Sequence, residues 1–232
     1  MFEEGAGRDP VTLPVPAWLV RHPQGTVLFD TGLHPDLAES GERLGWLADV
    51  FTVDVDDGRT VRARLEQRDV DPDAVDVVVL SHLHFDHAGG LALVPNARVV
   101  VQADEWAAGQ DPGAATTSYA PEDYDLGHDL ELVRGDHDLF GDGLVTCLAT
   151  PGHTAGHQSL RVRLDDREVV LAADCAYFAR TLDGGSLPPI GHDAAAQARG
   201  VARLRELRDA GATVVPGHDP AVWATLRQRD DM

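Results

Sequence analysis

Four apolar segments of this chain each run into a histidine or an aspartate, and this recurrence constrains the fold more than any other feature. The segments end at Leu80, Ala149, Ala173 and Val215, and each has the apolar, β-branched character of a buried strand. In an open α/β sheet, ligand sites lie outside the carboxyl ends of the strands. The pattern therefore predicts an α/β fold in which polar side chains collect at strand ends.

The densest of these strand ends is the stretch Ser81–Gly90, which places three histidines and one aspartate within six positions. Alternate side chains of an extended chain point to the same side, so His82 and His84 can meet one metal ion. Asp86 and His87 then begin a helical turn and face another direction, which suits a second ion. A metal site is a better interpretation of this density than a surface loop that happens to be rich in histidine.

The other three strand ends extend the set of candidate ligands. The full set is His82, His84, Asp86, His87, His153, Asp174 and His218. Imidazoles and carboxylates without thiolates suit Zn²⁺, and also Mn²⁺, Fe²⁺ or Co²⁺. Seven donors are too many for one tetrahedral ion and suit two, between which a hydroxide can lie. Because the cluster contains no serine or cysteine nucleophile with a nearby base, a metal-bound hydroxide is the predicted nucleophile.

Charge and composition exclude several classes of partner. The chain has 39 acidic and 19 basic residues, all of the latter arginine, and a formal net charge of −20. Nucleic acids and anionic membrane surfaces both require a positive footprint, so neither is an expected partner. We interpret the acidity as a solvated surface. The two cysteines, Cys147 and Cys175, lie in apolar segments and are predicted to be buried free thiols.

Length and hydrophobicity indicate one domain over residues 1–232. A hydrophobic fraction of 43% is enough to bury a sizeable core. The chain shows no apolar run of about 18 residues and no signal-peptide pattern at its first residues, so a cytoplasmic location is expected. The oligomeric state is left open.

Local patterns predict most of the remaining elements. Helices are expected at residues 60–68, 103–108 and 193–210, with Asp193 as the N-cap of the last. Strands are expected at residues 11–22, 26–30, 75–80, 98–102, 130–133, 144–149, 158–164, 168–173 and 213–216, and a long loop at 111–129. Asp30, at a strand end, is expected to bond nearby backbone N–H groups rather than a metal. His157 is expected to support the site from behind the ligands or to pack in the core, rather than to ligate.

Taken together, these motifs resemble the metallo-β-lactamase superfamily, and within it the N-acyl-homoserine lactonases, which are quorum-quenching enzymes. The resemblance rests on Ser81–Gly90, on Thr150–Leu160, on Asp174 followed by Tyr177, and on Gly217-His218-Asp219. Order and spacing agree from Val11 to His218. The resemblance implies an αββα sandwich of the metallo-β-lactamase type, with two mixed sheets flanked by helices. Because the Leu-Phe-Asp-Thr-Gly turn is reached by residue 32, a first strand and some pocket-lining residues of the family are expected to be lacking.

The resemblance also implies a role for each candidate residue. His82, His84 and His153 would hold one metal ion, Asp86, His87 and His218 the other, and Asp174 would bridge them. A bridging hydroxide would attack the lactone carbonyl. Tyr177 would hydrogen-bond the substrate near that carbonyl, and Asp86 would carry the proton. The remaining implied positions line the ligand pocket, and they are Phe85, Ile190 and Gly191. Tyr177 and Phe85 each have a simpler alternative role as packed aromatic side chains.

These observations favour a zinc-dependent hydrolase that opens the ring of N-acyl-homoserine lactones or similar small lactones. A different hydrolase on the same scaffold, such as a glyoxalase II-like thioester hydrolase, stays open. A redox metal protein is the third possibility, although its di-iron relatives usually carry glutamate where this chain has His84.

Overall fold

The computed structural model describes residues 11–111, 113, 118–187 and 191–230 of the chain. The chain divides into two compact units, one of residues 15–135 and one of residues 136–232 with 1–14. Each unit contains one five-stranded mixed sheet. Ile190, expected from the resemblance to line a pocket, lies outside the described residues.

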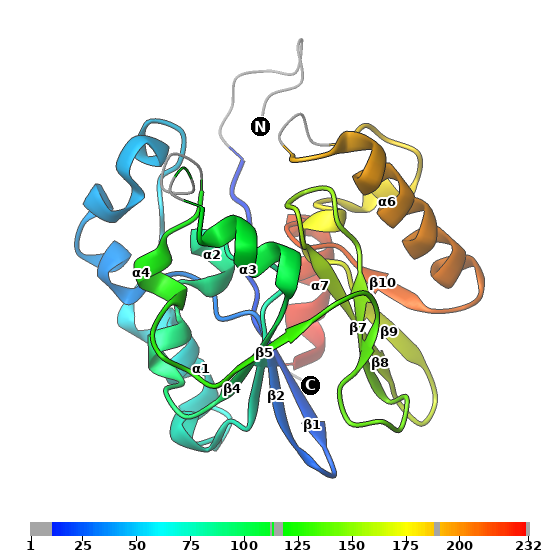
Figure 1. The fold of residues 1–232 in the computed structure, drawn as a ribbon, viewed down its shortest axis with the longest axis horizontal. Helices are drawn as coiled ribbons and strands as arrows, with labels where there is room; N and C mark the ends of the chain where they lie inside the picture. The colour runs from blue at the N-terminus through cyan, green and yellow to red at the C-terminus, as the bar shows by residue number, and fades with distance from the viewer. Residues whose placement is uncertain (1–10, 112, 114–117, 188–190, 231–232) are drawn as a thin grey trace. The chain divides into compact units, whose positions relative to one another are not determined.

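The unit of residues 15–135, drawn from blue to green in Figure 1, holds the sheet β1-β2-β3-β4-β5. The first two strands are antiparallel and the other neighbours are parallel. Its strands are β1 (Trp18–His22), β2 (Gly25–Phe29), β3 (Val77–Val79), β4 (Arg98–Gln102) and β5 (Leu130–Val133). Its α-helices are α1 (Val61–Glu66), α2 (Phe85–Ala88), α3 (Ala103–Gly109) and α4 (Pro121–Tyr124). Its 3₁₀ helices are η1 (Pro35–Ala38), η2 (Gly41–Asp49), η3 (Asp57–Arg59), η4 (Pro72–Ala74) and η5 (Leu91–Leu93).

The core of this unit lies between the sheet and the helices on one of its faces (Figure 1). Val78, Val99 and Val101 of the central strands pack with Val61 and Leu65 of α1. These valines are fully buried, which is why the central strands read as continuous apolar runs.

The unit of residues 136–232 holds the sheet β10-β9-β8-β7-β6, in which only β10 and β9 are parallel. Its strands are β6 (His137–Asp138), β7 (Val145–Ala149), β8 (Gln158–Arg163), β9 (Glu168–Leu171) and β10 (Thr213–Val215). Its helices are α5 (Ala179–Leu182), α6 (Ala194–Asp209), α7 (Pro220–Asp230) and the 3₁₀ turn η7 (Ala173–Cys175). Helix α6 buries Val201 and Leu204 against Leu148 and Val170 of the sheet. Cys147 and Cys175 are fully buried thiols that are not joined in a disulfide, as expected.

Most predicted elements are confirmed, with three corrections. Only residues 18–22 of the expected strand 11–22 are extended in a ladder, because Pro14 and Pro16 have no N–H to donate to one. The expected loop 111–129 contains the single-turn helix α4. The expected strand 168–173 ends at Leu171 and turns into η7.

Helix α6 begins as the sequence predicts. The Asp193 carboxylate accepts hydrogen bonds from Ala195 N and Ala196 N, at 2.9 and 3.0 Å, which satisfies donors of the first turn. None of the helices in the described ranges is long and apolar enough to cross a membrane.

Candidate metal centre

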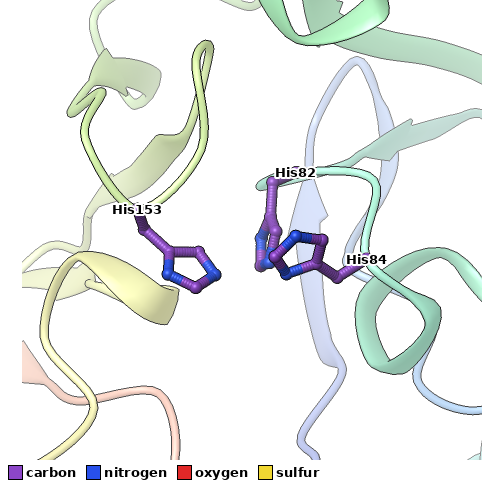
Figure 2. A group of neighbouring side chains, drawn as sticks. All are labelled: His82, His84 and His153. Carbon is purple, nitrogen blue, oxygen red and sulfur yellow. The ribbon is translucent and has the colours of Figure 1, made fainter. Parts of the chain in front are cut away.

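The segment that follows β3, a loop and the short helix α2, carries four of the seven candidate ligands. Figure 2 shows His82 and His84 on this loop, with ring centroids 4.5 Å apart in an edge-on arrangement. His82 is fully buried and His84 is half-buried. One residue further on the chain enters α2, so Asp86 and His87 lie in a helical turn as predicted. Because the chain changes from extended to helical within six residues, His82 and His84 project in a different direction from Asp86 and His87.

Asp30 and Ser81 orient two of these imidazoles. The Ser81 hydroxyl donates to Asp30 Oδ2 at 2.9 Å and therefore accepts from His82 Nδ1, also at 2.9 Å. His87 Nδ1 lies 2.9 Å from the same Asp30 oxygen and donates to it. Because Nδ1 of each ring is a donor in these bonds, Nε2 of both His82 and His87 is the nitrogen able to ligate.

Asp30 thus does more than the sequence indicated. It accepts from Ser81 N at 2.7 Å, which confirms the expected backbone bond. Its contact with His87 was not expected, because 57 residues separate the two in the chain. A carboxylate on the far nitrogen of a metal-ligating histidine fixes the ring and raises its basicity. A strand-end aspartate in the same sheet as the histidine motif was the signal that could have suggested the pair.

The Asp86 carboxylate lies beside Nε2 of His87, the nitrogen that is able to ligate. Asp86 Oδ2 is 3.5 Å from His87 Nε2, and the Asp86 side chain is 20% exposed. Two atoms that ligate one zinc ion at about 2.0–2.1 Å with tetrahedral angles lie about 3.3 Å apart. The Asp86–His87 spacing fits a shared ion.

In the other unit, Asp174 faces two histidines with its two oxygens. Oδ2 lies 3.2 Å from His153 Nε2, and Oδ1 lies 2.8 Å from His218 Nε2. All three side chains are buried, with exposed fractions of 2–4%. His153 stands on the turn that follows β7, drawn in Figure 2, Asp174 lies in η7, and His218 follows β10. Each oxygen of Asp174 therefore lies near a different histidine. This arrangement is expected of a carboxylate that bridges two ions.

Further contacts hold this second group of candidate ligands in place. His218 Nδ1 donates to the Pro14 carbonyl at 2.7 Å, which leaves Nε2 toward Asp174. The buried His157 accepts from Asp174 N at its Nε2, at 3.1 Å, and its Nδ1 bonds Thr150. The amide of Gln197, on α6, donates to the Asp174 carbonyl at 3.1 Å. His157 therefore supports Asp174 through its backbone.

The candidate substrate residues are partly buried or exposed. Tyr177 is half-buried, with its ring edge-on to His153 and His218 at centroid distances of 5.5 and 5.1 Å. Phe85 is also half-buried, and its ring centroid is 6.1 Å from that of Phe51. Gly191 is exposed. Tyr177 and Phe85 thus have aromatic contacts and also surface that a ligand could reach.

The chemistry of the two groups of donors fits divalent cations. Both consist of imidazoles and carboxylates, and neither contains a thiolate. The nitrogens that can ligate are set by hydrogen bonds on the opposite side of the ring in His82, His87 and His218. This is the usual arrangement of histidine at a metal.

Comparison with known proteins identifies the family. The model of the metallo-β-lactamase superfamily matches residues 10–218. The chain belongs to this superfamily. The match spans about nine-tenths of the chain and every candidate ligand, so the α/β fold with two mixed sheets expected from the resemblance is confirmed.

Within the superfamily, the chain is similar to lactonases. It is 34% identical to the N-acyl homoserine lactonase AttM of Rhizobium johnstonii over 98% of this chain and 89% of that protein. It is 30% identical to an N-acyl homoserine lactonase of a Bacillus species over 84% of this chain and 76% of that protein. Among solved structures, an N-acyl homoserine lactone hydrolase with the product N-hexanoyl-L-homoserine at its catalytic metal centre has a TM-score of 0.82. Its identity is 26%, over 92% of this chain and 84% of that one.

Proposed function

We propose that this protein is a metal-dependent hydrolase that opens the lactone ring of N-acyl-homoserine lactones. The observation that carries the proposal is Asp174, whose two oxygens each face the ligating nitrogen of a different histidine. The similarity of the chain to an N-acyl homoserine lactonase over 98% of its length supports this substrate class. A small lactone is also a suitable substrate for a chain whose net charge of −20 disfavours a polyanion.

The proposed ligands are divided between the two units. His82, His84 and His153 would hold one ion, Asp86, His87 and His218 the other, and Asp174 both. We propose zinc, because imidazole and carboxylate donors without thiolate suit it. When bound, such a pair supplies Lewis acidity and lowers the pKa of water to about 7.

The chain's own residues then have separate tasks. The Tyr177 hydroxyl would donate a hydrogen bond near the scissile carbonyl and orient the ring. The Asp86 carboxylate would carry the proton to the departing alkoxide, a contribution of roughly 10²–10⁴ in rate. Phe85 and Gly191, with Ile190, would line the substrate pocket.

The proposal is tested by measuring acid release from a panel of substrates. Each lactone opened yields one carboxylic acid, so the purified, zinc-supplemented chain should acidify a weakly buffered solution of homoserine lactones of several acyl lengths. Turnover of S-lactoylglutathione with no turnover of any lactone would contradict the proposal and favour a thioester hydrolase. Metal analysis should give close to two ions per chain.

Substitution of Asp86 tests its assigned task in the same assay. Asp86→Asn should lower kcat at least about 100-fold, because the amide cannot accept the proton. Tyr177→Phe should lower kcat by a smaller factor. Asp104→Asn is the control, since this carboxylate is exposed and pairs only with Arg134 in the described contacts. Full activity of Asp86→Asn would show that another group carries the proton.

A further inference from the structure

A buried carboxylate that belongs to none of the ligand groups lies beneath the loop with His82 and His84. Glu105, in the first turn of α3, has an exposed fraction of 0%. A glutamate is almost never fully buried unless its oxygens are bonded. The donors of the hydrogen bonds to the Glu105 carboxylate therefore indicate its structural role.

Glu105 Oε1 accepts two hydrogen bonds, and both lead to the ligand loop. One comes from Leu83 N at 3.1 Å, and Leu83 is the residue between His82 and His84. The other comes from the Tyr119 hydroxyl at 3.0 Å. Removing this oxygen would leave a buried backbone donor of the ligand loop without its acceptor.

Tyr119 carries the second bond on to His84. Its ring lies edge-on to the His84 ring with centroids 5.1 Å apart, and the backbones of the two residues form an isolated β-bridge. One carboxylate oxygen therefore fixes the peptide between two candidate ligands and the aromatic ring that packs on the second of them.

The far end of α3 contacts the same residue through packing. Leu83 is fully buried, and a Cβ added at Gly109 would lie 2.8 Å from Leu83 Cδ1. Helix α3 thus holds the Leu83 backbone at its first turn and receives the Leu83 side chain at its last. Both contacts restrict the chain segment from which His82 and His84 project.

We propose that Glu105 is a positioning residue that sets the geometry of His82 and His84 for metal binding, by holding Leu83 N and the Tyr119 hydroxyl. This inference rests on the proposed metal centre and adds a residue to it. Partners behind metal ligands typically change metal affinity by roughly 10- to 100-fold when they are removed.

The test is the zinc affinity of the full-length chain, measured by competition with a chromophoric chelator. Glu105→Ala should weaken the affinity of the tighter site by about 10- to 100-fold. Tyr119→Phe should weaken it less, because the Leu83 bond stays. Glu105→Gln keeps an acceptor oxygen at the same place and should retain most of the zinc affinity. It also provides a measurable variant if Glu105→Ala does not fold.

A second buried carboxylate of the same unit provides the control. Asp123 is 3% exposed and pairs with Arg43 rather than with the ligand loop. Asp123→Asn should lower the denaturation midpoint of the metal-free chain while zinc affinity stays within about twofold. This separates a loss of fold stability from a loss of ligand geometry.

Two outcomes would overturn the inference, and they differ. If the wild-type chain binds zinc and both Glu105 variants bind it equally well, Glu105 has no positioning role, although the proposed function stands. If the wild-type chain binds no zinc, the metal centre itself is wrong, and the role of Glu105 falls with it.

Discussion

Asp30 adopts a left-handed backbone conformation, with φ of 60°, at the point where β2 ends. Such a conformation costs a non-glycine residue about 1–3 kcal/mol, and aspartate tolerates it better than most residues do. The carboxylate accepts bonds from Ser81 and His87 in the buried site. Since a hydrogen bond to a charged group contributes about 1.5–3 kcal/mol, these bonds offset the strain.

Gly152, which immediately precedes His153, can carry no side chain. Its φ is +135°, and an added Cβ would lie 2.1 Å from Gln197 N, a backbone atom that cannot move aside alone. Gly152→Ala should lower the free energy of unfolding by roughly 3 kcal/mol or more, measured by urea denaturation.

Gly211→Ala separates the two causes. Gly211 also has a positive φ, of +109°, but nothing lies within 4 Å of an added Cβ. Only backbone strain of about 1–2 kcal/mol should appear there. Equal losses for the two variants would mean that contact with Gln197 is not the cause.

At the scale of elements, an ion pair ties α6 to the end of β7. Arg203 Nη1 and Nη2 donate to the two Asp136 oxygens at 2.8 and 2.5 Å. Both residues also bond Ala149, Asp136 through Ala149 N and Arg203 through the Ala149 carbonyl. The pair thereby encloses the last residue of β7, from which the turn to His153 departs.

The Asp136 pair should give a measurable pH dependence of stability. The hydrogen bond from Arg203 lowers the pKa of Asp136 below its ordinary value of 3.8. The ionised carboxylate therefore stabilises the fold above about pH 4, and this contribution is lost as the pH falls through the lowered pKa. Because both side chains are more than one-third exposed, we expect about 1 kcal/mol or less.

Urea denaturation of wild type and Asp136→Asn would check this. The variant should be less stable at pH 7, and the difference should shrink at pH 3. Asp166→Asn, at an exposed carboxylate beside Arg167, should have the same stability as wild type at both pH values. A difference that grows toward pH 3 would contradict the assigned sign.

The predictable elements are those whose pattern is local. Strand β4 was predicted at its observed bounds, because its β-branched run is buried on both faces. Helix α4 was missed, because a single turn has no periodicity to detect. Its position depends on distant partners: Asp123 pairs with Arg43, and the Tyr124 hydroxyl donates to the Gly109 carbonyl.

The same distinction holds at the site. The candidate ligands could be named from the sequence because their residue types recur at strand ends. The supporting residues could not, because Glu105 lies 22 residues from Leu83 and has no motif of its own. Gln197 falls within the helix predicted at residues 193–210 and has no motif of its own. Contacts of this kind follow from packing, which no local pattern records.

At the scale of the whole molecule, the acid excess gives the chain a formal net charge of −20. The chain has 39 acidic and 19 basic residues, and arginines such as Arg62 and Arg208 pair with exposed aspartates. Exposed pairs of this kind contribute at most about 1 kcal/mol each. The acidity therefore bears on solubility and choice of partner more than on the fold.

Both thiols are buried in one unit, so their alkylation rate can measure the unfolding of that unit. Cys147 and Cys175 belong to the unit of residues 136–232, whereas three of the four tryptophans belong to the unit of residues 15–135. Burial raises the pKa of the Cys175 thiol to about 12, so alkylation of the native chain should be slower than in a free peptide by at least about 10³-fold. Alkylation in urea would follow one unit and tryptophan emission mainly the other. We expect the two midpoints to coincide, and separate midpoints would show two units that unfold independently.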